Sequence, residues 1–128
     1  MLVDSHCHLD RRNLRAASVE EVLLRAKSAG VSGFICVGVG ASDEEAKEAV
    51  QLAETRSDVL AVVGLHPHEA AGHCDELYSS LKQLCSRSSV VAVGEIGLDY
   101  HYDFSPRDKQ REVFRTFIAL ARELGSRS

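Results

Sequence analysis

The sequence predicts an α/β fold in which parallel strands alternate with helices, arranged as about four β/α units of a (β/α)8 (TIM) barrel. Short apolar runs begin near residues 2, 33, 59 and 90, so the repeat is about 30 residues, the size of a βαβ unit. The last three runs are continuous rather than alternating, which predicts strands buried on both faces. Stretches with the helical spacing of apolar residues separate the runs. The same alternation is also typical of an open doubly wound sheet.

The expected strands are short and rich in aliphatic residues. They lie at Leu2–Val3, Phe34–Val39, Val59–Leu65 and Val90–Val93. A further strand is expected near residue 125, but the chain has 128 residues and a complete barrel needs roughly 250. Residues 1–128 are therefore predicted to form a single domain that is truncated before the fifth strand.

The first two expected helices carry capping signals. Ser18 and Glu21 fit a capping box, in which each side chain satisfies a backbone N–H of the first turn, and Gly30 is a natural end for this helix. Ser42 and Glu45 repeat the same spacing before the second helix.

The last two expected helices follow from apolar stripes. One stripe runs over Leu77–Cys85, where apolar residues recur at helical spacing. The other belongs to a helix that starts at Ser105 and Pro106, a cap followed by proline in the first turn, and ends at Gly125.

Composition places the chain among ordinary soluble globular proteins, with 45% hydrophobic and 27% charged residues. Fifteen basic and 19 acidic residues give a net charge of −4, which argues against a DNA-binding surface built on a clustered basic patch. No apolar run approaches the roughly 20 residues of a membrane helix, and the start lacks the pattern of a signal peptide. The four cysteines form no C-x-x-C pair and are interpreted as reduced thiols. We expect no membrane contact and a cytoplasmic location, or a nuclear one in a eukaryote.

Candidate metal ligands follow the first strand. Residues two apart in an extended chain project to the same face, so Asp4, His6 and His8 are expected to point together. Two neutral imidazoles so placed are able to chelate one divalent ion. The alternative is a pair of surface histidines in a loop.

Glu95 directly follows the fourth apolar run. A carboxylate in this position is costly to bury unless a positive partner meets it, and a metal ion is one such partner. Gly94 and Gly97 allow the backbone to turn closely around it. A salt bridge or a loop hydrogen bond is the alternative.

His66 follows the third apolar run, and Pro67 holds it in an extended conformation. From this position its ring is able to contact a phosphate or an attacking water. The alternative is a solvent-exposed turn. Asp99 is ambiguous between a ligand and a residue that anchors its own loop. His73 and His101 are expected on the surface, because neither lies at a strand end.

These motifs together resemble the TatD family of metal-dependent hydrolases. The resemblance rests on Asp4-Ser5-His6-Cys7-His8-Leu9, Gly64-Leu65-His66-Pro67-His68 and Gly94-Glu95-Ile96-Gly97-Leu98-Asp99-Tyr100, with a later stretch from Gln110 to Ala121. It implies a (β/α)8 barrel and a divalent-metal nuclease, typically a DNase that works from the 3′ end. It also implies that His6 and His8 hold one metal, that Glu95 bridges two metals, and that His66 faces the substrate phosphate.

The resemblance also implies ligands that this sequence lacks. Family members supply two further histidines and a later aspartate from beyond the fourth unit, so a two-metal centre is expected to be incomplete here. Histidine and carboxylate ligands suit Mg²⁺, Mn²⁺ or Zn²⁺, and their spacing does not choose among them.

Three functions stay open. The first is a hydrolase that cleaves DNA with Glu95 as its catalytic carboxylate, inactive or active in this short form. The second is a non-catalytic, truncated module that binds metal or self-associates to cover the open edges of a partial barrel. The third is a related ester or amide hydrolase, such as an aminoacyl-tRNA deacylase.

Overall fold

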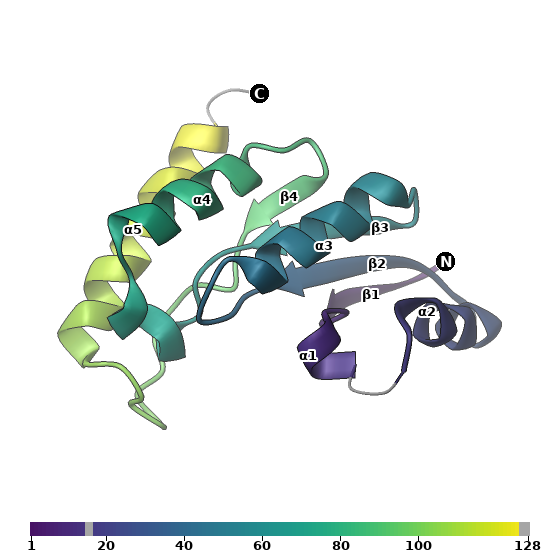
Figure 1. The fold of residues 1–128 in the computed structure, drawn as a ribbon, viewed down its shortest axis with the longest axis horizontal. Coiled ribbons are helices and arrows are strands. Elements are labelled where there is room, and N and C mark those ends of the chain that lie inside the picture. Colours follow the sequence, from purple (N-terminus) through teal and green to yellow (C-terminus); the bar gives the residue numbers. More distant parts are fainter. Residues whose placement is uncertain (15–16, 126–128) are drawn as a thin grey trace.

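The structure, a computed structural model, describes residues 1–14 and 17–125. It contains one parallel sheet whose strands lie in the order in which they occur along the chain (Figure 1). The strands are β1 (Leu2–Cys7), β2 (Val31–Gly38), β3 (Val59–Val63) and β4 (Val90–Val93). This order excludes the doubly wound alternative for these units, because in such a sheet the first strand lies between two others, whereas β1 is at the edge here. The predicted partial (β/α)8 barrel is confirmed.

Helices follow the strands in the predicted alternation. They are α1 (Arg11–Leu14), α2 (Val19–Ser28), α3 (Glu44–Thr55), the 3₁₀-helix η1 (Pro67–Gly72), α4 (Asp75–Cys85) and α5 (Arg107–Gly125). Helix α3 packs on β2 and β3, α4 packs on β3 and β4, and α5 packs on β4 and η1. In Figure 1 these three helices lie along the sheet from β2 to β4, with α2 beside β2.

The hydrophobic core lies between the sheet and these helices. Cys36, Ala61 and Val63 of the strands are buried there, together with Phe117 of α5. A close approach between sheet and helix is at Gly38, where an added Cβ would lie 2.7 Å from the Cα of Ala46 in α3. The absence of a side chain at this position therefore lets α3 lie directly against the end of β2.

The opposite face of the sheet is open, so the expectation of strands buried on both faces is wrong for β3 and β4. Leu60 is 44% exposed and Val91 is 50% exposed. The helices of the described residues cover only one face, and the continuous apolar pattern therefore includes residues that this part of the chain leaves largely exposed. In a barrel, such residues fill the interior.

One predicted helix start is confirmed and two differ from the structure. The confirmed one is the capping box formed by Ser18 and Glu21. The second capping box is wrong, because α3 begins after Asp43 and the Glu45 carboxylate lies against Gly40 instead of reaching back to the backbone of Ser42.

Ser105 is used differently from the predicted cap. Its buried hydroxyl donates to the carbonyl of His68 and accepts from the backbone N–H of Ala71, at 2.7 and 3.0 Å. It thus joins the start of α5 to η1 and positions the loop between β4 and α5.

All four cysteines are free thiols, as expected. None of the helices in the described ranges has the length and apolarity needed to cross a membrane.

Candidate metal centre

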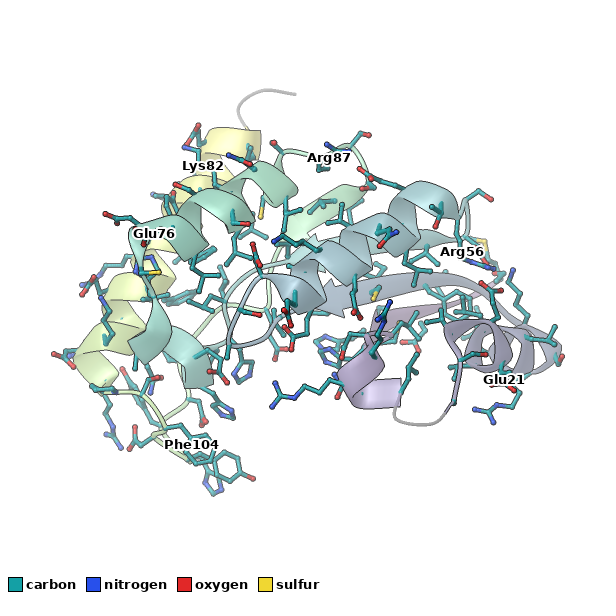
Figure 2. The ribbon with its side chains drawn as sticks, in the orientation of Figure 1. Glu21, Arg56, Glu76, Lys82, Arg87 and Phe104 are labelled. Atoms are coloured by element: carbon teal, nitrogen blue, oxygen red, sulfur yellow. The ribbon has the colours of Figure 1, made fainter. Side chains whose placement is uncertain are left out.

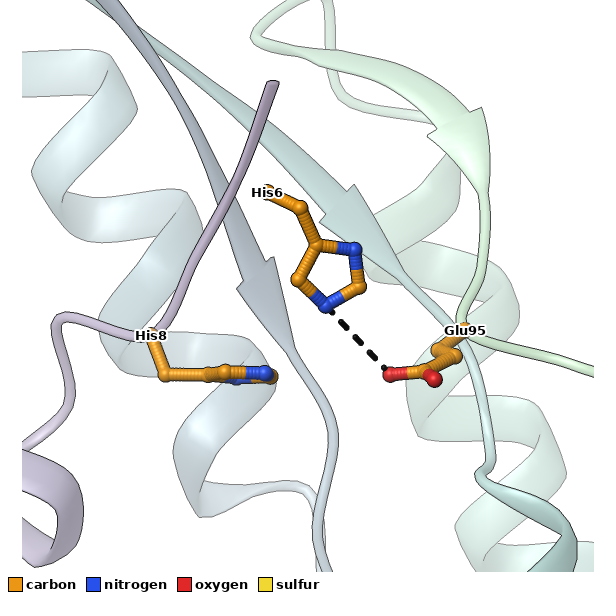
Figure 3. Close-up of side chains that lie close together, drawn as sticks. All are labelled: His6, His8 and Glu95. Carbon is orange, nitrogen blue, oxygen red and sulfur yellow. Dashed lines mark ion pairs between the residues drawn. The ribbon is translucent and has the colours of Figure 1, made fainter. Parts of the chain in front are cut away.

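The predicted ligands from the first and fourth strands meet in space. Figure 3 shows His6, His8 and Glu95 pointing toward one another, and one ligand atom from each lies within 4.8 Å of the others. Strands β1 and β4 are three positions apart, about 14 Å at the usual strand spacing. The sheet is therefore curved, and the side chains project from its concave face at the carboxyl ends of the strands.

Glu95 lies between two histidines. Its Oε2 is 3.6 Å from Nε2 of His6, and its Oε1 is 3.6 Å from Nε2 of His66. The carboxylate is half-buried and His66 is more enclosed than His6. One carboxylate thus presents each of its oxygens to a different imidazole, an arrangement that places its negative charge at the centre of the group.

The ring of His8 is held in one orientation. Its Nδ1 lies 3.0 Å from the carbonyl oxygen of Val37 at the end of β2. Because a carbonyl only accepts hydrogen bonds, Nδ1 carries the proton, and Nε2 keeps a free lone pair. This is the usual arrangement of a metal-binding histidine, in which the second nitrogen donates to a backbone carbonyl.

His66 is oriented by its own backbone. It has φ −60° and ψ 143°, the extended conformation predicted from Pro67. Its Nδ1 accepts the backbone N–H of His68 at 3.1 Å, so in the neutral ring Nε2 carries the proton. Burial lowers the pKa of His66, although the nearby Glu95 charge opposes this. His66 therefore presents an N–H donor beside the carboxylate.

Asp4 and Asp99 are not part of the metal-ligand group of the described residues. The Asp4 carboxylate accepts the backbone N–H of His6 at 3.1 Å. Asp99 contacts the ring of His68 and accepts the backbone N–H groups of His101 and Tyr102. The Asp99 carboxylate therefore anchors its own loop, while the residue also lines the cavity next to Glu95.

The two remaining histidines have different environments. His101 is exposed, as expected. The expectation for His73 is wrong, because its ring packs against Tyr78 and Phe117, and its buried Nε2 has no hydrogen-bond partner among the described residues. Tyr78 of α4 and Phe117 of α5 partly cover the His73 ring, and its position in the sequence did not indicate these tertiary contacts.

The donor set fits a divalent cation. It combines two imidazoles and one carboxylate, which suit Zn²⁺ and Mn²⁺ and are compatible with Mg²⁺ at the carboxylate. The tautomer of His8 leaves a lone pair free, and the negative charge of Glu95 compensates a cation. These groups lie on the concave side of the sheet at its carboxyl edge, the position of ligand sites in parallel α/β barrels.

Comparison with known proteins shows extensive similarity to one family. The sequence profile described as TatD related DNase matches residues 3–127. The uncharacterized metal-dependent hydrolase YabD of Bacillus subtilis is 40% identical over 124 residues, which make up 97% of this chain and 48% of that protein. The 3′-5′ ssDNA/RNA exonuclease TatD of Pectobacterium atrosepticum is 38% identical over 106 residues, 82% of this chain and 40% of that protein.

Solved structures give the same result. The crystal structure of YJJV, a TatD homologue from Escherichia coli K12, aligns with a TM-score of 0.81 at 32% identity, over 97% of this chain and 48% of that one. The chain thus spans about half the length of the relatives it matches. Because the profile covers nearly every residue and the fold agrees, the chain belongs to the TatD family of metal-dependent hydrolases.

Proposed function

We propose that this chain supplies His6, His8 and Glu95 to the metal site of a hydrolase that cleaves phosphodiester bonds in DNA. The convergence of the three side chains from the first and fourth strands carries the proposal. The similarity to a 3′-5′ ssDNA/RNA exonuclease and to a metal-dependent hydrolase supports the reaction class. The metal is Mg²⁺, Mn²⁺ or Zn²⁺, all of which accept this donor set.

The residues have distinct roles in this reaction. A divalent ion bound by His6, His8 and Glu95 would lower the pKa of water and offset the charge that develops on the phosphoryl oxygens. His8 keeps its Nε2 directed by its bond to Val37, so little reorganisation accompanies binding. His66 directs its Nε2–H toward the same carboxylate, a position from which it donates to a substrate phosphate oxygen.

Assembly without catalysis is the second candidate, and the open sheet face supports it. An apolar cavity of about 570 Å³ lies along β4 and the end of α5, lined in part by Val90, Val93 and Leu124. Together with exposed Leu60 and Val91, it offers a surface on which a second copy of the chain could close. Size-exclusion chromatography tests this role, because a stable monomer at high protein concentration contradicts it.

A cleavage assay tests the hydrolase proposal. Purified chain is incubated with single-stranded DNA and Mg²⁺ or Mn²⁺, and Glu95→Ala is compared with the wild type. We expect metal-dependent cleavage that Glu95→Ala abolishes and that Leu24→Ala, at an exposed position of α2, leaves unchanged. An absence of cleavage by well-folded wild-type chain overturns the proposal for this chain. Hydrolysis of aminoacyl-tRNA in place of DNA would assign the ester hydrolase reaction instead.

The four free thiols support a reducing compartment such as the cytoplasm.

A further inference from the structure

Two aromatic rings stand exposed at the tip of the loop between β4 and α5. Tyr102 is 61% exposed and Phe104 is 66% exposed. The rings stack on each other, with centroids 5.4 Å apart and planes at 21°. In Figure 2 the Phe104 side chain extends from this loop, at the end of the molecule where the carboxyl ends of the strands lie. Large apolar rings held in water are unfavourable, and an exposed pair next to a candidate active site indicates a binding role.

The loop that carries the rings is braced on its inner side. Asp99 contacts the His68 ring, and its carboxylate accepts the backbone N–H of Tyr102 at 3.3 Å. The buried Gln110 side chain accepts the N–H of Asp99 at 2.7 Å and donates to its carbonyl at 3.1 Å. These bonds fix the base of the loop to η1 and to α5.

The outer part of the loop is braced as well. Asp103 has a φ of 52° and pairs through both carboxylate oxygens with the Arg107 guanidinium. The fully buried hydroxyl of Ser105 donates a hydrogen bond to the backbone carbonyl of His68. The exposed rings are thus presented by a loop with defined geometry, which lowers the entropic cost of binding a ligand.

The rings border the candidate metal centre. The edge of the His68 ring approaches both Phe104 and Tyr102, with centroids 4.8 and 5.8 Å away. Tyr102, Glu95 and His66 line the same cavity, which has a volume of about 400 Å³. This volume is within the roughly 300–1,000 Å³ range of small-ligand pockets. A ligand that stacks on the Tyr102 ring therefore borders the cavity that Glu95 and His66 also line.

Two arginines lie beside the aromatic loop, and the carboxylate of Asp103 offsets part of the charge of Arg107. Arg107 lies over the Tyr100 ring, 4.6 Å from its centroid, and Arg111 contacts the Tyr100 hydroxyl at 3.3 Å. These guanidinium groups lie along the start of α5, beside the aromatic loop. Aromatic faces with flanking arginines are the features by which proteins hold unpaired nucleic-acid bases.

We propose that Tyr102 and Phe104 form a platform on which an unpaired base of single-stranded nucleic acid stacks, next to the phosphate that reaches Glu95 and His66. The inference rests on the proposed nuclease function and extends it to the residues that select an unpaired base. A base within a duplex is stacked on its neighbours, so the platform favours single strands or frayed ends.

A binding titration in EDTA tests the platform separately from cleavage. Fluorescence anisotropy follows the binding of a labelled oligodeoxythymidylate and of an abasic strand of equal length and charge. We expect Tyr102→Ala and Phe104→Ala each to weaken binding of the first strand by about 5- to 150-fold. Tyr102→Phe and Phe104→Tyr keep the aromatic face and are expected to bind like the wild type.

The control is Leu24→Ala, which removes an equally exposed apolar side chain from α2. We expect no change in binding, and far-UV circular dichroism confirms the fold of every variant. Equal affinity of the wild type for the thymidylate and abasic strands, or unchanged binding by Phe104→Ala and Tyr102→Ala, overturns the platform. Because the titration contains EDTA, it measures binding without metal-dependent cleavage. Loss of cleavage in Glu95→Ala, with base-dependent binding retained, supports both proposals. Base-dependent binding without any metal-dependent cleavage contradicts only the hydrolase.

Discussion

Gly64→Ala tests whether close backbone packing positions Glu95. An added Cβ at Gly64 would lie 2.7 Å from the carbonyl carbon of Gly94 and 2.8 Å from its oxygen. This is about 0.7 Å closer than the 3.4 Å at which ordinary contacts begin, and the opposing atoms are backbone and are unable to rotate away. The segment must shift, which strains the 2.9 Å hydrogen bond from Gly94 N–H to the Val63 carbonyl and moves Glu95 away from His6.

We expect two measurable effects. Crowding in a packed region costs about 1–3 kcal/mol in the free energy of unfolding, measured by urea denaturation. Displacement of a metal ligand lowers Mn²⁺ affinity by roughly 10- to 100-fold, measured by isothermal titration calorimetry. The control is Gly72→Ala, where the added Cβ meets nothing within 4 Å. Wild-type Mn²⁺ affinity in a destabilised Gly64→Ala variant would refute the positioning role of this contact.

Three further predictions concern stability and reactivity. Phe117→Ala removes a fully buried ring and is expected to cost about 3–5 kcal/mol in urea denaturation, so a loss below 1 kcal/mol would contradict its central place in the core. Hydrogen bonds from Arg56 and Lys27 lower the pKa of Asp58 to about 2. The ionised carboxylate therefore contributes roughly 1 kcal/mol to the free energy of unfolding, after solvent screening, above pH 4, and this contribution is lost as the pH falls toward 2. The stability difference between wild type and Asp58→Asn should shrink across that range, and a pH-independent difference opposes the assignment. Burial raises the pKa of Cys85 to about 11, so at pH 8 a thiol reagent should modify exposed Cys74 much faster, and equal rates would show that Cys85 is accessible.

The fold was predictable because its signals are local and repeated. Apolar runs about 30 residues apart mark the strands, and Ser18 with Glu21 marks a helix start that the structure confirms. The convergence of His6, His8 and Glu95 was also predictable, because parallel strands end at one edge of a sheet. These inferences need only periodicity and strand direction.

Other features depend on contacts between distant parts of the chain. Glu45 was expected to complete a capping box, but its carboxylate lies against Gly40, near Arg12 of α1. His73 was expected on the surface, but its ring is half-buried against Tyr78 of α4 and Phe117 of α5. A spacing rule does not include these partners, because they are set by the packing of helices on the sheet.

The aromatic loop illustrates the same limit. Nothing in the local pattern indicates that Asp99 contacts His68, which is 31 residues away, while also accepting the backbone N–H of Tyr102. The open sheet face has a related cause. Leu60 has the residue type of a buried strand, and only the arrangement of helices shows that its face is uncovered.

Mn²⁺ binding to the wild type and to Glu95→Gln tests most directly whether the three converging side chains hold a cation. Glutamine keeps the size of the side chain and removes its charge, and His101→Ala serves as a control that changes an exposed histidine. Electron paramagnetic resonance measures Mn²⁺ binding, and we predict that binding to the wild type is saturable. Glu95→Gln and His8→Ala are each expected to weaken Mn²⁺ affinity by at least about tenfold, and His101→Ala is expected to leave it unchanged. Equal affinity in the wild type and Glu95→Gln would contradict a metal centre at this site.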